Sequence, residues 1–170
     1  SRLESGRLQL KQEWCDISDL IGVAVKSVDY CSSNHPIHIH VQPDVPLIQI
    51  DFVLMEQVIV NLLDNACNYT PPSTPITIAA KIVGQHVEIT VSDTGQGIPP
   101  DAIERIFEKF YRLPGTPSGG TGLGLSISRG LTEAHGGTLS AENLPEGGAK
   151  FTLRLPLSSS PPPVQEAQHG

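Results

Sequence analysis

The sequence predicts an α+β fold: a two-layer α/β sandwich with a mixed, mostly antiparallel sheet and helices on one face. Two pairs of segments alternate apolar and polar residues across short turns, which is typical of β-hairpins. Other segments have helical periodicity instead. The length of 170 residues suffices for one domain and is too short for two ordinary ones.

The first half of the chain begins with residues 1–15, whose leucines among charges predict the end of an upstream helix and a linker. Asp16 or Ser18 is placed to cap a second helix, which runs to Val28. Two short strands are then expected, at residues 36–41 and 46–51.

The rest of the chain supplies a helix and the two hairpins. Residues 52–67 have a helical period, and residues 76–92 form the first hairpin around a Gly-Gln turn. A helix over residues 124–135 follows a glycine-rich stretch and leads into the second hairpin, residues 138–155. Residues 158–170 are rich in serine and proline and predict a disordered tail.

Composition excludes several classes of function. The net charge of −7 argues against a general nucleic-acid binder, which needs a basic face. No apolar run approaches the roughly 20 residues of a membrane span, so we expect no direct membrane contact from this segment. Cys15, Cys31 and Cys67 are odd in number and form no C-x-x-C pair, which predicts reduced cysteines in a cytoplasmic setting.

The helix over residues 52–67 carries an unusual row of amides. At about 100° per residue, Asn61, Asn65 and Asn68 fall within roughly 60° of arc, opposite the apolar face. A solvated polar face explains such a row simply. The alternative is a hard-cation site, because an amide oxygen can ligate Mg²⁺ whose other positions go to water and nucleotide phosphates.

Three further motifs follow in order. Asp93-Thr-Gly95-Gln-Gly97-Ile98 places an acceptor beside a backbone that a flat ligand can approach, although Asp-x-Gly is also a common turn. The pair Phe107 and Phe110 is typical of core packing, and the residues after it suggest a mobile lid.

The last motif, Gly120-Thr121-Gly122-Leu123-Gly124-Leu125, opens a helix whose free N–H groups form an anion site. It is neither the dinucleotide-binding fingerprint nor a P-loop.

The order of these motifs resembles the N, G1, F and G2 boxes of the ATP-binding domain of sensor histidine kinases, which has the Bergerat-type fold. The resemblance spans residues 16–157. Shorter strings, including Pro145-Glu-Gly-Gly-Ala149, are similar to the potassium-sensing branch of that family. The implied function is delivery of the γ-phosphoryl group of ATP to a histidine in two-component signalling, with potassium or osmotic sensing as the implied stimulus.

The resemblance implies a role for each motif residue. Asn65 would ligate Mg²⁺, Asn61 would face the phosphates as a catalytic residue, and Tyr69 would line the pocket beside Asn68. Asp93 would accept a hydrogen bond from the adenine amino group. The remaining nucleotide-binding residues would be Gly95, Gly97, Ile98, Gly120, Thr121, Gly122, Leu123 and Gly124.

Three positions qualify this resemblance. Arg112 would neutralise γ-phosphate charge as a second catalytic residue, in a lid of residues 111–119. Asn68 stands where the family often has a lysine, which keeps open a regulatory nucleotide-binding module without transfer activity. Asn61 stands where the related hydrolysing ATPases have a glutamate, and an amide cannot activate water, which disfavours the ATP-hydrolysing alternative.

The histidines predict where the phosphoryl group goes. None of the six is followed by the acidic residue of the family's phosphoacceptor. The acceptor is therefore expected on an upstream dimerisation domain of the same protein, with a response regulator as the next partner. The implied location is the cytoplasmic part of an inner-membrane sensor protein. His38 and His40 share a strand face, for which zinc ligation and simple solvation are the two alternatives.

Overall fold

A computed structural model describes residues 3–4, 7–113 and 124–158 of the chain. Its main sheet is five-stranded, and the β4–β6 pair is parallel whereas the other described pairs in it are antiparallel. The strands, in spatial order, are β4 (Ile37–Val41), β6 (Ile76–Val83), β7 (His86–Asp93), β9 (Ala149–Pro156) and β8 (Thr138–Asn143). The predicted fold class and both hairpins are confirmed.

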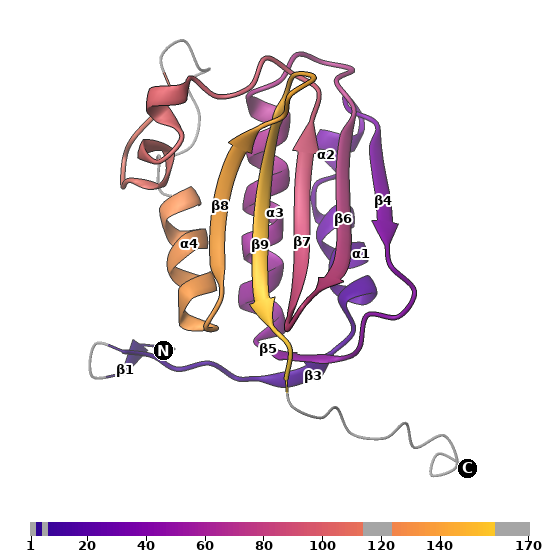
Figure 1. The fold of residues 1–170 in the computed structure, drawn as a ribbon, viewed down its shortest axis with the longest axis vertical. Coiled ribbons are helices and arrows are strands. Elements are labelled where there is room, and N and C mark those ends of the chain that lie inside the picture. The colour runs from indigo at the N-terminus through magenta and orange to yellow at the C-terminus, as the bar shows by residue number, and fades with distance from the viewer. Residues whose placement is uncertain (1–2, 5–6, 114–123, 159–170) are drawn as a thin grey trace.

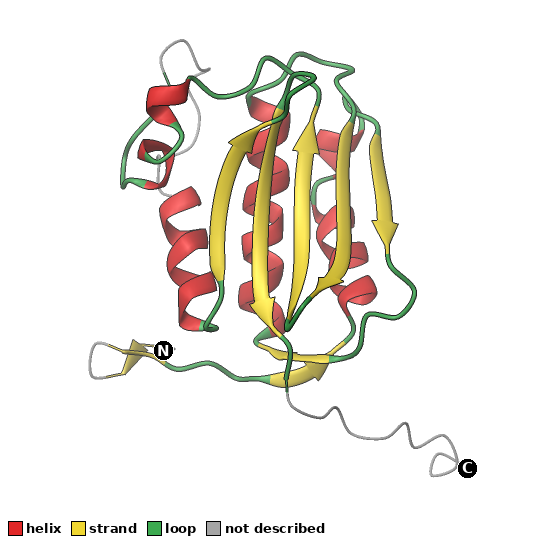
Figure 2. Ribbon diagram, viewed as in Figure 1, coloured by secondary structure: helices red, strands yellow, loops and turns green. Residues whose placement is uncertain are grey.

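Three helices cover one face of this sheet, as Figure 1 and Figure 2 show. They are α1 (Ile17–Ser27), α3 (Phe52–Asn68) and α4 (Gly124–Ala134). α3 lies in the middle and contacts α1 on one side and α4 on the other. Shorter elements complete the fold: α2 (Asp29–Ser32) and two 3-10 turns, η1 (Pro100–Ala102) and η2 (Arg105–Phe107).

The core lies between the sheet and the helices, where the buried faces of both layers pack together. Every second residue of β7 is buried, and the apolar side of α3 is buried as well. Fully buried side chains from the two layers include Met55, Ile59, Leu62, Ile78 and Ile89. Removing this apolar surface from water drives the packing of helix on sheet. The polar side of α3 lies outside this packed face.

Aspartates cap the N-terminal ends of α1 and α3. Asp16 caps α1, because its carboxylate accepts a 2.7 Å hydrogen bond from the backbone N–H of Ser18, so Asp16 is the cap of the two predicted candidates. Asp51 caps α3 by accepting from the N–H of Leu54 at 3.2 Å. Asp51 also accepts from the N–H of Lys11 at 2.9 Å, and this contact attaches the N-terminal segment to the domain.

The start of the chain differs from the prediction. Among the described residues, β1 (Leu3–Glu4) pairs antiparallel with β2 (Arg7–Leu8) where the end of a helix was expected. A helix end of one or two turns is not stable on its own, because nucleation is costly. The assignment of residues 1–15 to an upstream helix and linker stays a prediction about the longer protein.

Only one of the two strands of a small second sheet was predicted. The expected strand at residues 46–51 is β5 (Ile48–Ile50), and it pairs antiparallel with β3 (Glu13–Cys15), which was not foreseen. This sheet crosses one end of the sandwich (Figure 1). Of the predicted tail, Ser158 is described and accepts a hydrogen bond from the N–H of Gln49, while residues 159–170 lie outside the described part.

The prediction of three reduced cysteines is wrong for two of them. The structure joins Cys31 of α2 and Cys67 of α3 in a disulfide, with their Cα atoms 5.8 Å apart. Packing of α2 against the end of α3 brings the two residues together, and sequence spacing does not reveal such packing. Cys15 is free and buried, and burial raises the pKa of its thiol.

Candidate functional site

A pocket of about 280 Å³ lies along the polar side of α3. Its walls come from α3, the end of β7 and the loop after it, the segment before residue 114, the first residues of α4, and the start of β9. The predicted site residues among its lining are Asn61, Asn65, Asn68, Tyr69, Asp93, Gly97, Ile98, Arg112 and Gly124. The structure thus brings together motifs that are up to 63 residues apart in the chain.

The amide row on α3 forms one wall of this pocket. Asn61 and Asn65 are half-buried in it, and Asn68 is more exposed at its rim. The amide nitrogen of Asn61 donates to the carbonyl of Gly124 at 3.2 Å and to the hydroxyl of Ser128 at 3.0 Å. Asn61 therefore holds the start of α4 beside α3. The row lines a pocket rather than an open, solvated helix face.

Asp64 is a pocket residue that the sequence analysis missed. It lies on the same side of α3 as the amide row, between Asn61 and Asn65. Its Oδ1 is buried and has no hydrogen-bond partner in the structure. Burial raises the pKa of this carboxyl. The available signal was its spacing of three residues from Asn61, which places it on the amide face.

Asp93 also lines the pocket, at the end of β7. It is 8% exposed, and its Oδ1 accepts from the backbone N–H of Gly95 at 2.8 Å and of Ala149 at 3.4 Å. Both of these bonds go to one oxygen, so the carboxylate is oriented by the backbone while its Oδ2 is left for a ligand. This is the geometry of a fixed acceptor.

The loop after Asp93 contains a glycine with a positive φ and is hydrogen-bonded to Asn143 of β8. Gly97 has a φ of +83°, and a Cβ there would lie 2.7 Å from Asn143 Oδ1. Asn143 accepts from the N–H of Ile98 and donates to its carbonyl, both at 2.7 Å. Gly95, also a predicted binding residue, is not among the residues that line the pocket, and a Cβ there would lie 2.8 Å from the methyl carbon of Thr70.

Tyr69 and Arg112 lie close together in the pocket wall. Burial raises the pKa of the Tyr69 phenol, and the positive charge of Arg112 opposes that shift. Tyr111, next along the chain, also lines the pocket, and the Arg105 guanidinium lies 4.6 Å from its ring centroid. The aromatic pair splits: Phe107 is buried against Phe151, as core packing predicts, whereas Phe110 is 69% exposed.

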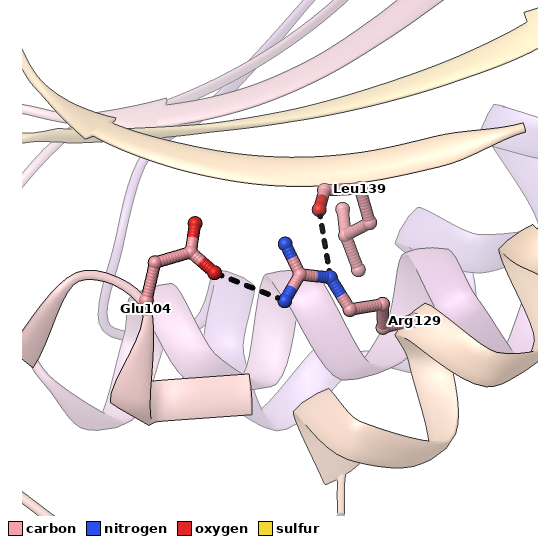
Figure 3. Close-up of polar contacts among 3 residues, drawn as sticks. All are labelled: Glu104, Arg129 and Leu139. Carbon is pink, nitrogen blue, oxygen red and sulfur yellow. Dashed lines mark hydrogen bonds and ion pairs between the residues drawn. The ribbon is translucent and has the colours of Figure 1, made fainter. Parts of the chain in front are cut away.

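Arg129 of α4 contacts Glu104, which lies in the segment that precedes the pocket residues Tyr111 and Arg112 (Figure 3). Its Nε donates to the Leu139 carbonyl and its Nη1 to Glu104 Oε2, both at 3.2 Å. Its guanidinium also lies 4.0 Å from the centroid of the Phe107 ring. Arg129 thus joins α4, β8 and the 3-10 turns. Arg129 was not predicted from the sequence, because a lone arginine in a helix forms no recognisable pattern.

The anion site predicted at the start of α4 is described in part. Gly124 opens α4 and lies in the pocket, so the first N–H groups of this helix lie at the pocket wall. Gly120, Thr121, Gly122 and Leu123 lie outside the described residues.

The structure also tests the zinc alternative for the histidines. His38 and His40 are exposed on β4, and no three His, Cys, Asp or Glu side chains among the described residues are grouped to hold a metal ion. The zinc alternative therefore has no support. No described helix is long and apolar enough to cross a membrane.

Comparison with known proteins defines the class. A family model described as histidine kinase-, DNA gyrase B-, and HSP90-like ATPase matches residues 50–159, and the chain belongs to this family. Within it, the chain is an ATP-binding domain of the sensor histidine kinase type.

One relative shows the similarity over nearly the whole chain. Sensor protein KdpD of Escherichia coli (strain K12) is 38% identical over 162 residues, which are 95% of this chain and 18% of that protein. The chain thus spans less than a fifth of that relative.

Solved structures agree with this assignment. Full-length ShkA in complex with AMPPNP superposes with a TM-score of 0.78 at 26% identity, covering 98% of this chain and 34% of ShkA. The mycobacterial sensor histidine kinase MprB gives 0.76 at 27% identity, covering 85% of this chain and 98% of the MprB chain. The Bergerat-type fold that the resemblance implied is therefore confirmed.

Proposed function

We propose that this domain binds Mg-ATP and delivers its γ-phosphoryl group to a histidine on an upstream domain of a longer two-component sensor. The observation that carries the proposal is one pocket lined by unlike polar groups. A carboxylate oriented by the backbone, Asp93, lines it together with the amides of α3 and the start of α4. Such a pocket matches a ligand with an amino-bearing ring and an anionic tail.

The adenine end rests on Asp93. An exocyclic amino group donates hydrogen bonds, and a carboxylate accepts them strongly. Because the N–H groups of Gly95 and Ala149 already orient the carboxylate, it loses little freedom when the ring binds. A guanine ring presents an acceptor at the corresponding position and would be rejected there.

The residues on the amide side of α3 fit a magnesium ion. Asn65 offers an amide oxygen, and Asp64 has a buried carboxylate oxygen with no partner, so hard oxygen donors gather on this side of α3. Asn65 would hold the ion, and water and phosphate oxygens would fill its remaining positions. When bound, the ion supplies neutralisation of phosphate charge.

The phosphates themselves would lie against the start of α4. Asn61 holds this helix start in place through Gly124 and Ser128, and the first N–H groups of the helix attract anions. Arg112 is the proposed cation for the γ-phosphate, and residues 120–123 are proposed as further backbone donors. Catalysis by this chain consists of positioning and electrostatic stabilisation.

Transfer is favoured over hydrolysis by Asn61. An amide has no basicity near neutral pH, so it cannot take a proton from an attacking water. The proposed partners are the upstream dimerisation and phosphoacceptor domain and then a response regulator. In this proposal the domain lies in the cytoplasm, attached to an inner-membrane sensor, and the stimulus (for which the resemblance implies potassium or osmotic conditions) is read elsewhere in that protein.

Two measurements test the proposal. ADP release by the domain alone is expected to be negligible, and addition of the histidine-bearing helical domain in trans is expected to give acid-labile phosphate on that partner. Transfer in trans should be slow, because the covalent link raises the effective concentration in the longer protein. Robust ATP turnover by the domain alone would favour the hydrolysing ATPase, and nucleotide binding with no transfer would favour the regulatory module.

A further inference from the structure

Asp64 is the acidic residue of the pocket to which the proposed function gives only a general role, as one of the hard oxygen donors beside Asn65. It lines the pocket on the amide side of α3, one residue before Asn65 and three after Asn61. The bond from Asn61 to Gly124 places this turn of the helix beside the start of α4, which is the proposed phosphate end. Asp64 therefore puts a negative charge where a polyphosphate would lie.

A structural role does not account for this carboxylate. Asp51, the N-cap of the same helix, is a structural aspartate: it is 1% exposed and accepts hydrogen bonds from the backbone N–H groups of Lys11 and Leu54. Asp64 has a buried oxygen without any partner. A buried acceptor without a partner destabilises the folded state, so its presence calls for a ligand that completes it.

The charge of Asp64 decides which form of the nucleotide is attracted. Metal-free ATP carries only negative charge on its phosphates and is repelled by a nearby carboxylate in a partly desolvated pocket. A divalent cation bound together with the nucleotide would reverse the sign of that interaction, because the Asp64 carboxylate would attract it. Asn65, being neutral, cannot make this distinction by charge.

We propose, on the basis of the Mg-ATP function proposed above, that Asp64 makes nucleotide binding conditional on the divalent cation. Its carboxylate penalises metal-free ATP and stabilises the cation-bound form, so that the domain discriminates between the two states of the same nucleotide. Asp64 is thus a specificity-determining residue for the cation–nucleotide complex, acting beside the proposed metal ligand Asn65.

The test is a set of equilibrium titrations with three probes: Mg-ATP, ATP in excess chelator, and adenosine. Wild type should bind ATP in chelator no more tightly than adenosine, because repulsion by Asp64 cancels what the phosphates gain. The ratio of Mg-ATP affinity to metal-free ATP affinity should fall about tenfold in Asp64→Asn, which keeps the size of the side chain and removes its charge. Adenosine affinity should not change.

Two further variants separate charge from packing. Asp44→Asn removes the same charge from an exposed loop outside the pocket and should leave all three affinities as in wild type. Asp64→Glu keeps the charge and should retain most of the metal dependence. If Asp64→Asn does not fold, the wild-type comparison of metal-free ATP with adenosine still decides.

Each outcome has one meaning. An unchanged affinity ratio in Asp64→Asn, or metal-free ATP binding to wild type more than tenfold tighter than adenosine, overturns the inference about Asp64. A parallel loss of adenosine affinity in Asp64→Asn also overturns it, because the residue would then only shape the pocket. Failure of wild type to bind Mg-ATP at all would instead overturn the proposed function.

Discussion

The two ends of α3 treat their polar groups in opposite ways. At the N-terminal end, Asp51 is satisfied from several sides: its carboxylate accepts from two backbone N–H groups, and its own N–H donates to His135 Nε2 at 3.0 Å. Further along the helix, Asn65 and Asp64 line a pocket, and an oxygen of Asp64 has no partner. Polar groups paired within the chain stabilise the fold, whereas those left unpaired around a cavity are available to a ligand.

The largest expected effect is a loss of nucleotide binding, without loss of stability, on substitution at the pocket end of α3. Asn65→Ala should weaken Mg-ATP binding about a hundredfold or more, because it removes the proposed metal ligand. The midpoint of thermal unfolding without nucleotide should stay within a few degrees of wild type, since the Asn65 side chain lies outside the packed face. Calorimetric titration and a thermal melt check both halves, and unchanged Mg-ATP affinity would remove Asn65 from the site.

The reverse pattern is expected at the N-terminal end. Asp51→Ala should lower the free energy of unfolding by about 2–4 kcal/mol, because it removes a helix cap and leaves the Lys11 N–H without its acceptor. Urea denaturation measures this loss. Mg-ATP affinity, determined where the variant is fully folded, should be near that of wild type. A variant with normal stability and impaired binding would erase the distinction between the two ends.

A third substitution examines the pocket carboxylate at the end of β7. Asp93→Asn should cost about 1.5–3 kcal/mol in ATP binding, the range for a hydrogen bond to a charged acceptor. GTP should already bind weakly to wild type, and a fluorescent-nucleotide competition assay measures both. Equal affinities of wild type for ATP and GTP would contradict the role of Asp93 as the adenine acceptor.

The smallest expected effect concerns pH and the capped end. His135 Nε2 accepts from the Asp51 N–H, so its Nδ1 carries the proton and donates to the Leu131 carbonyl. Burial lowers the pKa of His135 below its ordinary value of about 6.5, so the unfolded chain takes up this proton first as pH falls. Stability should be complete above about pH 6.5 and decline below it.

Chemical denaturation at several pH values measures that decline. His135→Asn should flatten it relative to wild type, whereas replacement of the exposed His38 should not. An equal pH dependence in wild type and His135→Asn would show that another group is responsible.

Local patterns were enough to predict much of this molecule. Period-two and helical segments gave the hairpins, the three long helices and the sandwich, because each buries one regular face. The amide row was predicted for the same reason: Asn61, Asn65 and Asn68 share a stripe on a helix of known period. Motif order gave Asp93 and Gly97, and the structure places both in the pocket.

What the sequence did not reveal depends on contacts between distant segments. The β3–β5 pair, the Cys31–Cys67 disulfide and the Arg129 contacts each join residues whose approach is set by tertiary packing. Asp64 was overlooked for a different reason. A carboxylate on the polar side of a helix is typical of a solvated surface, and only the pocket around it distinguishes the two cases.

Hydrogen exchange with and without Mg-ATP tests the contrast between the two ends of α3 most directly. At labelling times of seconds, when local opening dominates, nucleotide should slow exchange in peptides covering residues 61–70 and 93–98. Peptides covering residues 48–56 should exchange at the same rate in both conditions, because the Asp51 end is already complete. Uniform protection along the whole helix, or none at residues 61–70, would contradict the account.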